Sequence, residues 1–288
     1  MVATEVRSKE SGVGRRERHR VVAVSYLNTK PLLYGLLRSS IQSELEMDLA
    51  IPSECARRLL NGEADIALVP VAVIPELPET QIISDYCIGA DGAVATVCIY
   101  GDVPIGEMTD IYLDHHSRTS VMLTRLLLDE YWGLNPNLIA AEDGYIDRIG
   151  GSTGGLVIGD RTIGLAKRFK YVYDLGEVWK THTGLPFVFA AWVSVKPLQP
   201  EFVTAFNEAL REGMEHLPEL QLLLSSPHPD FDLVEYFTHH IDYDLDGPKR
   251  EALARFLAYV GAVPSSGSAS SGPHSSPGEG AAAGAMKG

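Results

Sequence analysis

The chain has 288 residues, enough for one large hydrophobic core or for two lobes of about 100 residues each. Its 38 acidic residues outnumber 24 basic ones and give a net charge of −14, which argues against a nucleic-acid partner because phosphate binding needs a basic surface. The hydrophobic fraction of 45% is ordinary for a globular protein, and no apolar stretch approaches the length of a membrane span, so we expect no membrane partner.

The two ends of the chain differ in composition from the middle. Met1 to Arg20 is charged and lacks the run of about seven apolar residues found in a secretory signal, so we expect a cytoplasmic protein. Pro264 to Gly288 is rich in Ser, Gly, Ala and Pro and has little apolar surface to bury. We therefore predict disordered tails over residues 1–20 and 263–288.

The first predicted strand delivers a polar cluster to its carboxyl end. Val21 to Val24 is an apolar run typical of a buried parallel strand, and Thr29-Lys30-Pro31 begins a helix that continues through Leu32 to Leu37. Ser25-Tyr26-Leu27-Asn28 lies between them. In open α/β sheets ligands bind at this edge, where helix amino termini present unpaired N–H groups. The alternative is a simple turn in which Asn28 bonds its own backbone.

Strand and helix then alternate. A strand is predicted over Leu45 to Ala50, a short helix from Pro52-Ser53 to Gly62, and a strand over Asp65 to Val69. Ala93 to Tyr100 follows as a long extended run.

A second polar cluster follows the predicted strand Ile111 to Leu113. Ser117 is the natural N-cap of the next helix, and Ser117-Arg118-Thr119-Ser120 places three hydroxyls and an arginine at its positive dipole end. Such an arrangement suits a carboxylate or a phosphate. The alternative is an ordinary capped helix with no ligand.

The remaining pattern indicates two lobes. Leu156 to Ile158 and Tyr171 to Tyr173 are further short strands, Phe187 to Val195 is a second long apolar run, and only helices are expected after it, with Pro200 to Glu215 the clearest. Two long extended runs that bracket a central α/β unit fit a clamshell in which each run crosses between the lobes.

The cysteines and histidines show no metal-binding spacing. Cys55, Cys87 and Cys98 are an odd number without a C-x-x-C pair, and we interpret them as reduced thiols, with Cys98 buried in a strand. Cys87 lies within residues 84–89, which we expect to form a loop. No motif places a histidine as the partner base of a nucleophilic cysteine. His115-His116 and His239-His240 are adjacent pairs, whose side chains are expected to point to different sides of an element rather than to one metal.

Five segments in order resemble the chorismate dehydratase family of menaquinone biosynthesis. The resemblance runs from about Val21 to about Val260 and rests on these stretches: Val24 to Leu32, Gly62 to Pro70, Leu113-Asp114 with Ser117 to Ser120, Ile158-Gly159-Asp160, and Trp179 with Thr183 to Ala190. Three positions depart from the family pattern: Thr96 stands where Ser is common, and Arg161 and Thr162 follow Asp160 where small residues are usual.

The resemblance implies a fold and an activity. The fold is an α/β, two-lobed, type II periplasmic-binding-protein-like fold with the ligand cleft between lobes, here over residues 21–98 and 192–262 (lobe 1) and 99–191 (lobe 2). The activity is that of a hydro-lyase, which removes water from chorismate to give 3-[(1-carboxyvinyl)oxy]benzoate in the futalosine route. The implied reaction uses no cofactor and no metal. The sequence leaves the oligomeric state undetermined.

The candidate site residues follow from the residue pattern and from the family resemblance. Asn28 and Asp160 are the catalytic candidates, and the substrate-binding candidates are Ser25, Tyr26, Ser84, Ile88, Gly89, Ser117, Arg118, Thr119, Ser120, Gly184, Leu185 and Pro186. Asn28 cannot act as a base, but its amide can hold the leaving hydroxyl or a carboxylate. Three possibilities stay open: Asp160 is the base, Asp160 is only an N-cap, or the substrate's own enolpyruvyl carboxylate takes the proton.

The fold alone allows two other functions. Most proteins of this architecture bind a small solute without chemistry, so the main alternative is a non-catalytic binding protein for small carboxylates. A ligand-sensing regulator would need a helix-turn-helix, for which the first 20 residues are too short and irregular.

Overall fold

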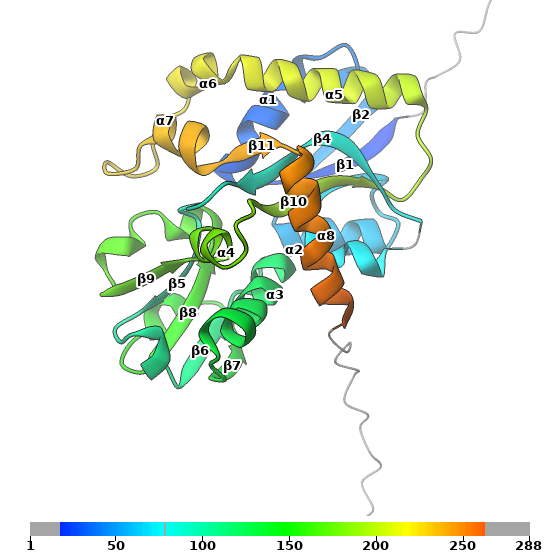
Figure 1. The fold of residues 1–288 in the computed structure, drawn as a ribbon. Coiled ribbons are helices and arrows are strands. Elements are labelled where there is room, and N and C mark those ends of the chain that lie inside the picture. The colour runs from blue at the N-terminus through cyan, green and yellow to red at the C-terminus, as the bar shows by residue number, and fades with distance from the viewer. Residues whose placement is uncertain (1–17, 78, 263–288) are drawn as a thin grey trace, which may run out of the picture.

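The computed structural model describes residues 18–77 and 79–262, which build two sheets placed one above the other (Figure 1). The predicted tails lie outside these residues, apart from residues 18–20. His19 and Arg20, assigned to the tail from the sequence, belong instead to the first strand, where they pair with Leu45 and Glu46.

The first sheet has six strands in the order β11-β4-β10-β3-β1-β2. Their bounds are β1 His19–Val24, β2 Leu45–Ala50, β3 Ile66–Pro70, β4 Gln81–Ala90, β10 Phe187–Ser194 and β11 Asp242–Asp244. β1 is parallel to both of its neighbours, whereas β10 runs antiparallel to β3 and β4. β1 therefore lies one strand in from the edge of this sheet, and both of its neighbours support the loop that follows its carboxyl end.

The second sheet has five strands in the order β7-β6-β8-β5-β9. Their bounds are β5 Val97–Gly101, β6 Asp110–Leu113, β7 Asn137–Ala140, β8 Thr153–Ile158 and β9 Tyr171–Asp174. β6 is parallel to β7 and β8, so the loop after β6 and the loop after β8 emerge at the same edge.

Helices cover both sheets, and their bounds are α1 Lys30–Arg38, α2 Pro52–Leu60, α3 Arg118–Leu127, α4 Leu175–Thr183, α5 Pro200–Glu215, α6 Leu217–Leu223, α7 Leu233–Glu235 and α8 Gly247–Ala262. In Figure 1, α1 and α5 lie together above the first sheet, α2 and α8 lie below it, and α3 and α4 flank the second sheet. None of the helices in the described part of the chain has the length and apolarity needed to cross a bilayer.

Two glycines let α1 and α5 approach closely. A Cβ at Gly35 would lie 1.9 Å from the carbonyl oxygen of Ala209, and one at Gly213 would lie 2.3 Å from that of Pro31. Backbone therefore packs on backbone, and α5 fixes the helix that begins just after Asn28.

Most of the predicted elements are confirmed. β2 spans the predicted residues, α1 and α2 begin with Pro in their first turn, and Ser117 caps α3. Two expectations are wrong. Residues 84–89 belong to the long strand β4 rather than to a loop, and β11 contradicts the expectation of helices only after β10. Both strands belong to the first sheet, and neither has the strict alternation of apolar and polar residues that would have predicted a strand from the sequence.

The chain crosses between the lobes at other residues than the sequence suggested. β10 pairs along its whole length with β3 or β4, so residues 187–191 belong to the first sheet, while Val97 and Cys98 pair with β8 in the second. The crossings are the short segments 91–96 and 184–186. The run Phe187 to Val195 does not cross, because nearly all of it is the strand β10 of the first sheet. The run Ala93 to Tyr100 overlaps a crossing only at residues 93–96 and then enters β5 of the second sheet.

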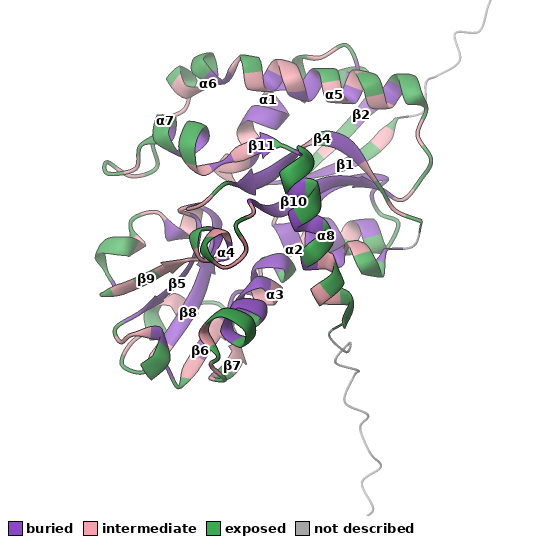
Figure 2. Ribbon diagram, viewed as in Figure 1, coloured by how far each residue is buried: buried purple, intermediate pink, exposed green. Residues whose placement is uncertain are grey.

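Buried residues concentrate on the strands of both sheets and on the helix faces that pack against them (Figure 2). All three cysteines are buried free thiols, and Cys98 lies in β5 as predicted. Burial raises the pKa of the Cys55 thiol to about 12, and it raises that of Cys87 and Cys98 further. These thiols are therefore protonated and unreactive at neutral pH.

A buried carboxylate fixes the edge of the first sheet that lies away from the cleft. Asp65 is 3% exposed and accepts hydrogen bonds from the Arg20 guanidinium at 2.7 Å and from the Lys196 ammonium at 2.6 Å. Burial alone would raise the pKa of this carboxyl, but the two cations hold it well below its usual range. The interaction joins the start of β1 to the residues around β3 and β10.

We predict that Asp65→Asn lowers the free energy of unfolding at neutral pH by about 2 kcal/mol, because charged hydrogen bonds are lost. Since the pKa of Asp65 is lowered by folding, its contribution is present above the unfolded value near about 4 and is lost as the pH falls toward the folded value. Urea unfolding of both proteins at neutral and acidic pH measures this. A difference that stayed constant down to acidic pH would contradict the assignment.

Candidate active site

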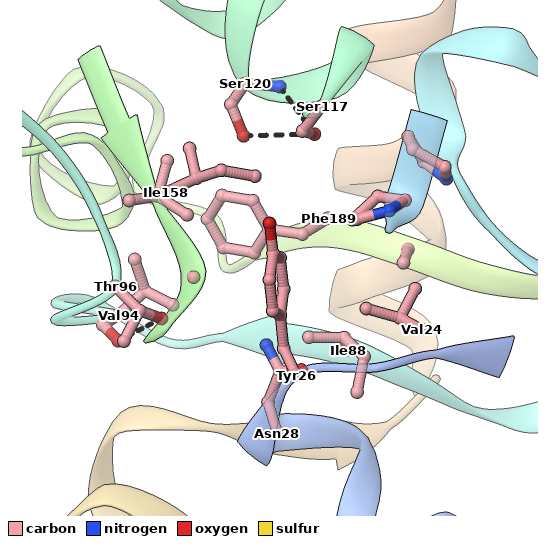
Figure 3. A pocket seen from close by; sticks show the side chains of 15 residues that line it. Val24, Tyr26, Asn28, Ile88, Val94, Thr96, Ser117, Ser120, Ile158 and Phe189 are labelled. Atoms are coloured by element: carbon pink, nitrogen blue, oxygen red, sulfur yellow. Dashed lines mark hydrogen bonds between the residues drawn. The ribbon is translucent and has the colours of Figure 1, made fainter. Parts of the chain in front are cut away.

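A cleft lies between the two lobes, where the loop after β1 faces the amino terminus of α3. Its polar lining consists of Tyr26, Asn28, Thr96, Ser117 and Ser120 (Figure 3). The remaining lining is apolar or backbone and comes from Val24, Pro52, Pro70, Ile88, Val94, Val97, Ile158, Gly159, Phe189 and Ala190. The space between these residues measures about 470 Å³, a figure that includes its opening to solvent.

Asn28 is held by its backbone, which leaves its side chain for the cleft. Its carbonyl accepts a hydrogen bond from the hydroxyl of buried Tyr243 at 2.9 Å, and its side-chain oxygen accepts one from Thr29 Oγ1 at 3.3 Å. Figure 3 shows the amide nitrogen directed into the cavity. The short 3-10 helix Leu27–Thr29 places Asn28 at this edge. The side chain of Asn28 is therefore placed where its amide can donate a hydrogen bond to a ligand in the cleft.

The amino terminus of α3 forms the opposite wall. Ser117 Oγ caps the helix by accepting from the Ser120 backbone N–H at 3.3 Å, and the two hydroxyls lie 3.2 Å apart. Both side chains are buried against the cleft. The other two members of the predicted cluster point elsewhere: Thr119 Oγ1 accepts from the backbone N–H of Ala72 at 3.1 Å, and Arg118 is exposed and pairs with Glu76 at 2.9 Å.

The described residues that line the cleft include no Lys or Arg. An anion there would be bound by hydroxyls, the Asn28 amide, and the N–H groups and dipole of α3. Such a lining suits an anionic ligand with an apolar body, because Ile88, Ile158 and Phe189 cover the rest.

Asp160 connects the two lobes. Both of its carboxylate oxygens accept from the backbone N–H of Leu27, at 3.1 and 3.2 Å. Burial raises the pKa of Asp160, while the Leu27 N–H and the nearby Lys30 oppose this. Its backbone neighbour Gly159 lines the cleft, whereas its carboxylate holds the Tyr26–Asn28 loop from behind.

Asp114 organises the second lobe's side of the cleft. This fully buried carboxylate accepts from the His116 N–H at 3.0 Å, the Ile158 N–H at 3.0 Å, the Tyr145 hydroxyl at 2.9 Å and the Arg161 guanidinium at 2.5 Å. Arg161, the charged departure seen in the sequence, therefore pairs with Asp114.

Tyr26 joins this network from the first lobe. Its hydroxyl lies 2.6 Å from His116 Nδ1, and burial raises the pKa of the phenol to about 12, against the lowering effect of Arg161. Its ring lies against Gly159, which has φ of +65° and where a Cβ would come within 2.5 Å of the ring. Only glycine satisfies both the backbone and the space at this position.

The structure does not bring all predicted residues into the cleft. Ser25 is exposed, Ser84 Oγ accepts from the Tyr86 N–H at 2.9 Å, and Gly89 packs against the carbonyls of Phe187 and Asp242. Gly184, Leu185 and Pro186 form one crossing between the lobes, where the Pro186 carbonyl accepts from Trp179 Nε1 at 3.0 Å. Of the binding candidates, Tyr26, Ile88, Ser117 and Ser120 line the cavity.

Sequence reasoning missed several residues of the site. Tyr236 is fully buried, with its hydroxyl 3.1 Å from Thr96 Oγ1 and close enough to the Asn28 side chain to hydrogen bond with it. His116, Tyr145 and Phe189 were also missed as members of the site. These residues come from distant parts of the chain and share no motif, so only the fold reveals them.

The adjacent histidines behave differently from the expectation. Asp114, His115 and His116 each offer a ligand atom within 4.8 Å of the others, so the pair does not diverge as predicted. However, Asp114 is already neutralised by Arg161, and that guanidinium would repel a cation. The residues present therefore do not favour a metal ion there.

Solved structures share this two-lobed fold. A protein from Archaeoglobus fulgidus matches with a TM-score of 0.65 and 14% identity, over 85% of this chain and 97% of its own. A Candida albicans protein described as having the generic periplasmic binding protein fold matches with a TM-score of 0.54 and 15% identity, over 86% of this chain and 92% of its own. The chain thus has the predicted periplasmic-binding-protein-like architecture, with a cleft between its two lobes.

The sequence comparisons identify the family. Residues 19–262 match the family described as menaquinone biosynthesis. The chain is also 30% identical over 235 residues to the chorismate dehydratase of Thermus thermophilus, which covers 74% of this chain and 85% of that protein. The chain belongs to the menaquinone biosynthesis family that includes chorismate dehydratase, as the resemblance implied.

We predict that Gly159→Ala destabilises the protein by about 3 kcal/mol, because the new methyl group adds a collision with Tyr26 to the strain of a positive φ. Gly151→Ala is the matched control, since Gly151 has φ of +56° but nothing within 4 Å of its Cβ position, and about 1 kcal/mol is expected there. Equal losses in urea unfolding would show that Tyr26 does not pack against Gly159.

Proposed function

We propose that the protein is a chorismate dehydratase, which eliminates water from chorismate to give 3-[(1-carboxyvinyl)oxy]benzoate. The family membership carries this proposal, and the cleft supports it because Asn28 and the Ser117–Ser120 pair face one another across the cavity. We further propose that it acts in the cytoplasm in the futalosine route to menaquinone; the three free thiols fit a reducing compartment.

The amino terminus of α3 is assigned to the ring carboxylate. Removal of the proton from the carbon that bears the enolpyruvyl ether leaves charge that delocalises through the adjacent double bond into this carboxylate. Donors aimed at that carboxylate therefore stabilise the charge as it develops, an effect worth several kcal/mol for positioned donors. Ser117 and Ser120 are the side chains on α3 that line the cleft.

The position of Asp160 favours the substrate's own enolpyruvyl carboxylate as the base. Both oxygens of Asp160 accept from the Leu27 N–H, and its carboxylate stands behind the loop rather than in the cavity lining. Asp160 then contributes by holding Tyr26 and Asn28 in place. Expulsion of hydroxide follows, driven by aromatisation, and the Asn28 amide orients the departing oxygen.

The direct test is conversion of chorismate by the purified protein, followed by the rise of the aromatic product and its mass. Turnover should persist after treatment with a chelator, because the proposed steps use only side chains and substrate groups. Binding of chorismate without turnover would instead support the non-catalytic binding protein.

We predict that Asn28→Asp lowers kcat by about two to three orders of magnitude, the usual effect of losing one positioned donor, because a negative charge then faces an anionic substrate. The Asp side chain fits the same turn, so the melting temperature should stay unchanged. Asn28→Ala, which removes the donor without adding charge, should lose less. Near-normal turnover in Asn28→Asp would reduce Asn28 to a turn residue.

A further inference from the structure

A second cavity lies behind the cleft on the second lobe. It holds about 770 Å³, including its broad opening to solvent, and His115, His116, Tyr145 and Arg161 line it. Tyr26 lines the cleft, and His116 lines this outer cavity. Their hydrogen bond of 2.6 Å between Tyr26 Oη and His116 Nδ1 is thus a polar connection from the cleft to an outer, solvent-facing cavity.

The proposed reaction needs a proton at the leaving oxygen. The base side of the elimination is accounted for by the substrate carboxylate, but hydroxide is a poor leaving group unless a donor protonates it as the carbon–oxygen bond breaks. Asn28 offers only an amide, which does not give up a proton. Among the polar residues that line the cleft, Tyr26 is the one with the most acidic proton, since the others are aliphatic hydroxyls and an amide.

We propose that Tyr26 is the proton donor to the departing hydroxide and that His116 resupplies it from the outer cavity. This inference rests on the proposed dehydratase function. As the carbon–oxygen bond breaks, its electron pair leaves with oxygen, the Tyr26 proton moves to that oxygen, and water forms. The proton on His116 Nδ1 moves to Tyr26 Oη, and His116 Nε2 takes a proton from water in the outer cavity. Between turnovers the ring returns to its starting tautomer, because Nε2 gives its proton back to that water and Nδ1 regains one through Tyr26 from water in the emptied cleft.

The surroundings of the pair suit this relay. Burial raises the pKa of Tyr26 to about 12, so the phenol keeps its proton at neutral pH and is still more acidic than the water it would form. Burial, with Arg161 beside it, lowers the pKa of His116, so the ring is neutral at neutral pH. A neutral ring can lose its proton from Nδ1 while it takes up another at Nε2. The His116 backbone N–H donates to the Asp114 carboxylate at 3.0 Å, and the His116 carbonyl accepts from the Ser53 N–H at 2.9 Å. The backbone of His116 is thus held by both lobes.

The proton balance closes without a further reactant. The substrate carboxylate removes one proton from carbon and releases it to solvent with the product. The outer cavity supplies one proton to the leaving oxygen. Chorismate therefore loses one water and nothing else, in agreement with the proposed reaction.

The test compares kcat and KM for chorismate in four single variants and one double variant. We expect Tyr26→Phe, which keeps the ring but loses the proton, to lower kcat about 100-fold with KM within a few-fold. His116→Ala should lower kcat by about tenfold or more. His115→Ala is the matched control, because His115 lines the same cavity without contacting Tyr26 Oη, and its kcat should stay close to that of the wild type.

Added imidazole distinguishes the relay from a structural role. The outer cavity is open, so imidazole should enter the space left in His116→Ala and restore part of kcat, but it should not restore the Tyr26→Phe, His116→Ala double variant, whose loss should equal that of Tyr26→Phe alone. His116→Asn keeps an N–H near the position of Nδ1 but cannot pass a proton, so it should remain slow.

Three outcomes would overturn the relay. Full kcat in His116→Asn would mean that only the hydrogen bond matters. Unchanged kcat in Tyr26→Phe would show that Tyr26 is not the proton donor. His116→Ala would also contradict the relay if its kcat stayed low in the presence of imidazole while its melting temperature equalled that of the wild type. That result would show that no proton reaches Tyr26 through His116. The kcat of each variant is compared with that of a wild type that converts chorismate. A wild type without that activity would contradict the proposed function rather than the relay.

Discussion

The buried carboxylate of Asp114 is the interaction on which the site depends. It lies at the end of β6 and binds the end of β8, the loop before α3, Tyr145 and Arg161 at once. A fully buried charge is stable only when it is paired and hydrogen-bonded, so these four partners are fixed relative to one another. The consequence reaches the cleft, because the same segments carry His116, Ser117 and Gly159. The amino terminus of α3 is thus held in register with the rim of β8, and the wall formed by these elements is rigid before any ligand arrives.

Several of the polar contacts between the two lobes involve residues next to the site. Asp160 accepts from the Leu27 N–H, Thr119 accepts from the Ala72 N–H, and the Ser53 N–H donates to the His116 carbonyl. Each contact places a backbone group of the first lobe on the β6–α3 or β8 side of the second. The positions of Asn28 and Ser117 relative to one another are therefore fixed by the approach of the lobes. In the proposed mechanism this geometry is what turns a binding cleft into a catalytic one.

In the proposed function, the cleft binds an anionic substrate although its described lining contains no cation. The net charge of the whole chain, −14, would repel a dianion. The cleft offsets this repulsion with neutral hydrogen-bond donors and a helix dipole rather than with Lys or Arg. Neutral donors stabilise a carboxylate without pairing so strongly that charge could not redistribute along the substrate. The arginines near the site are occupied elsewhere, Arg161 by Asp114 and Arg118 by Glu76.

The sequence by itself determined the local features of this protein. The apolar run of β1, the proline that opens α1 and the Ser117 cap of α3 are set by residues within one turn of each other, and all three formed as predicted. The motifs, read together, also determined the family. Only the tertiary structure decided which side chains of each motif reach the cleft. Ser117 and Ser120 face it while Arg118 and Thr119 do not, because the packing of α3 against both lobes sets how the helix is turned about its axis. The strands β4 and β11, the pairing of Tyr26 with His116 and the contact of Asp160 with Leu27 join residues far apart in the chain, and no local preference encodes such contacts.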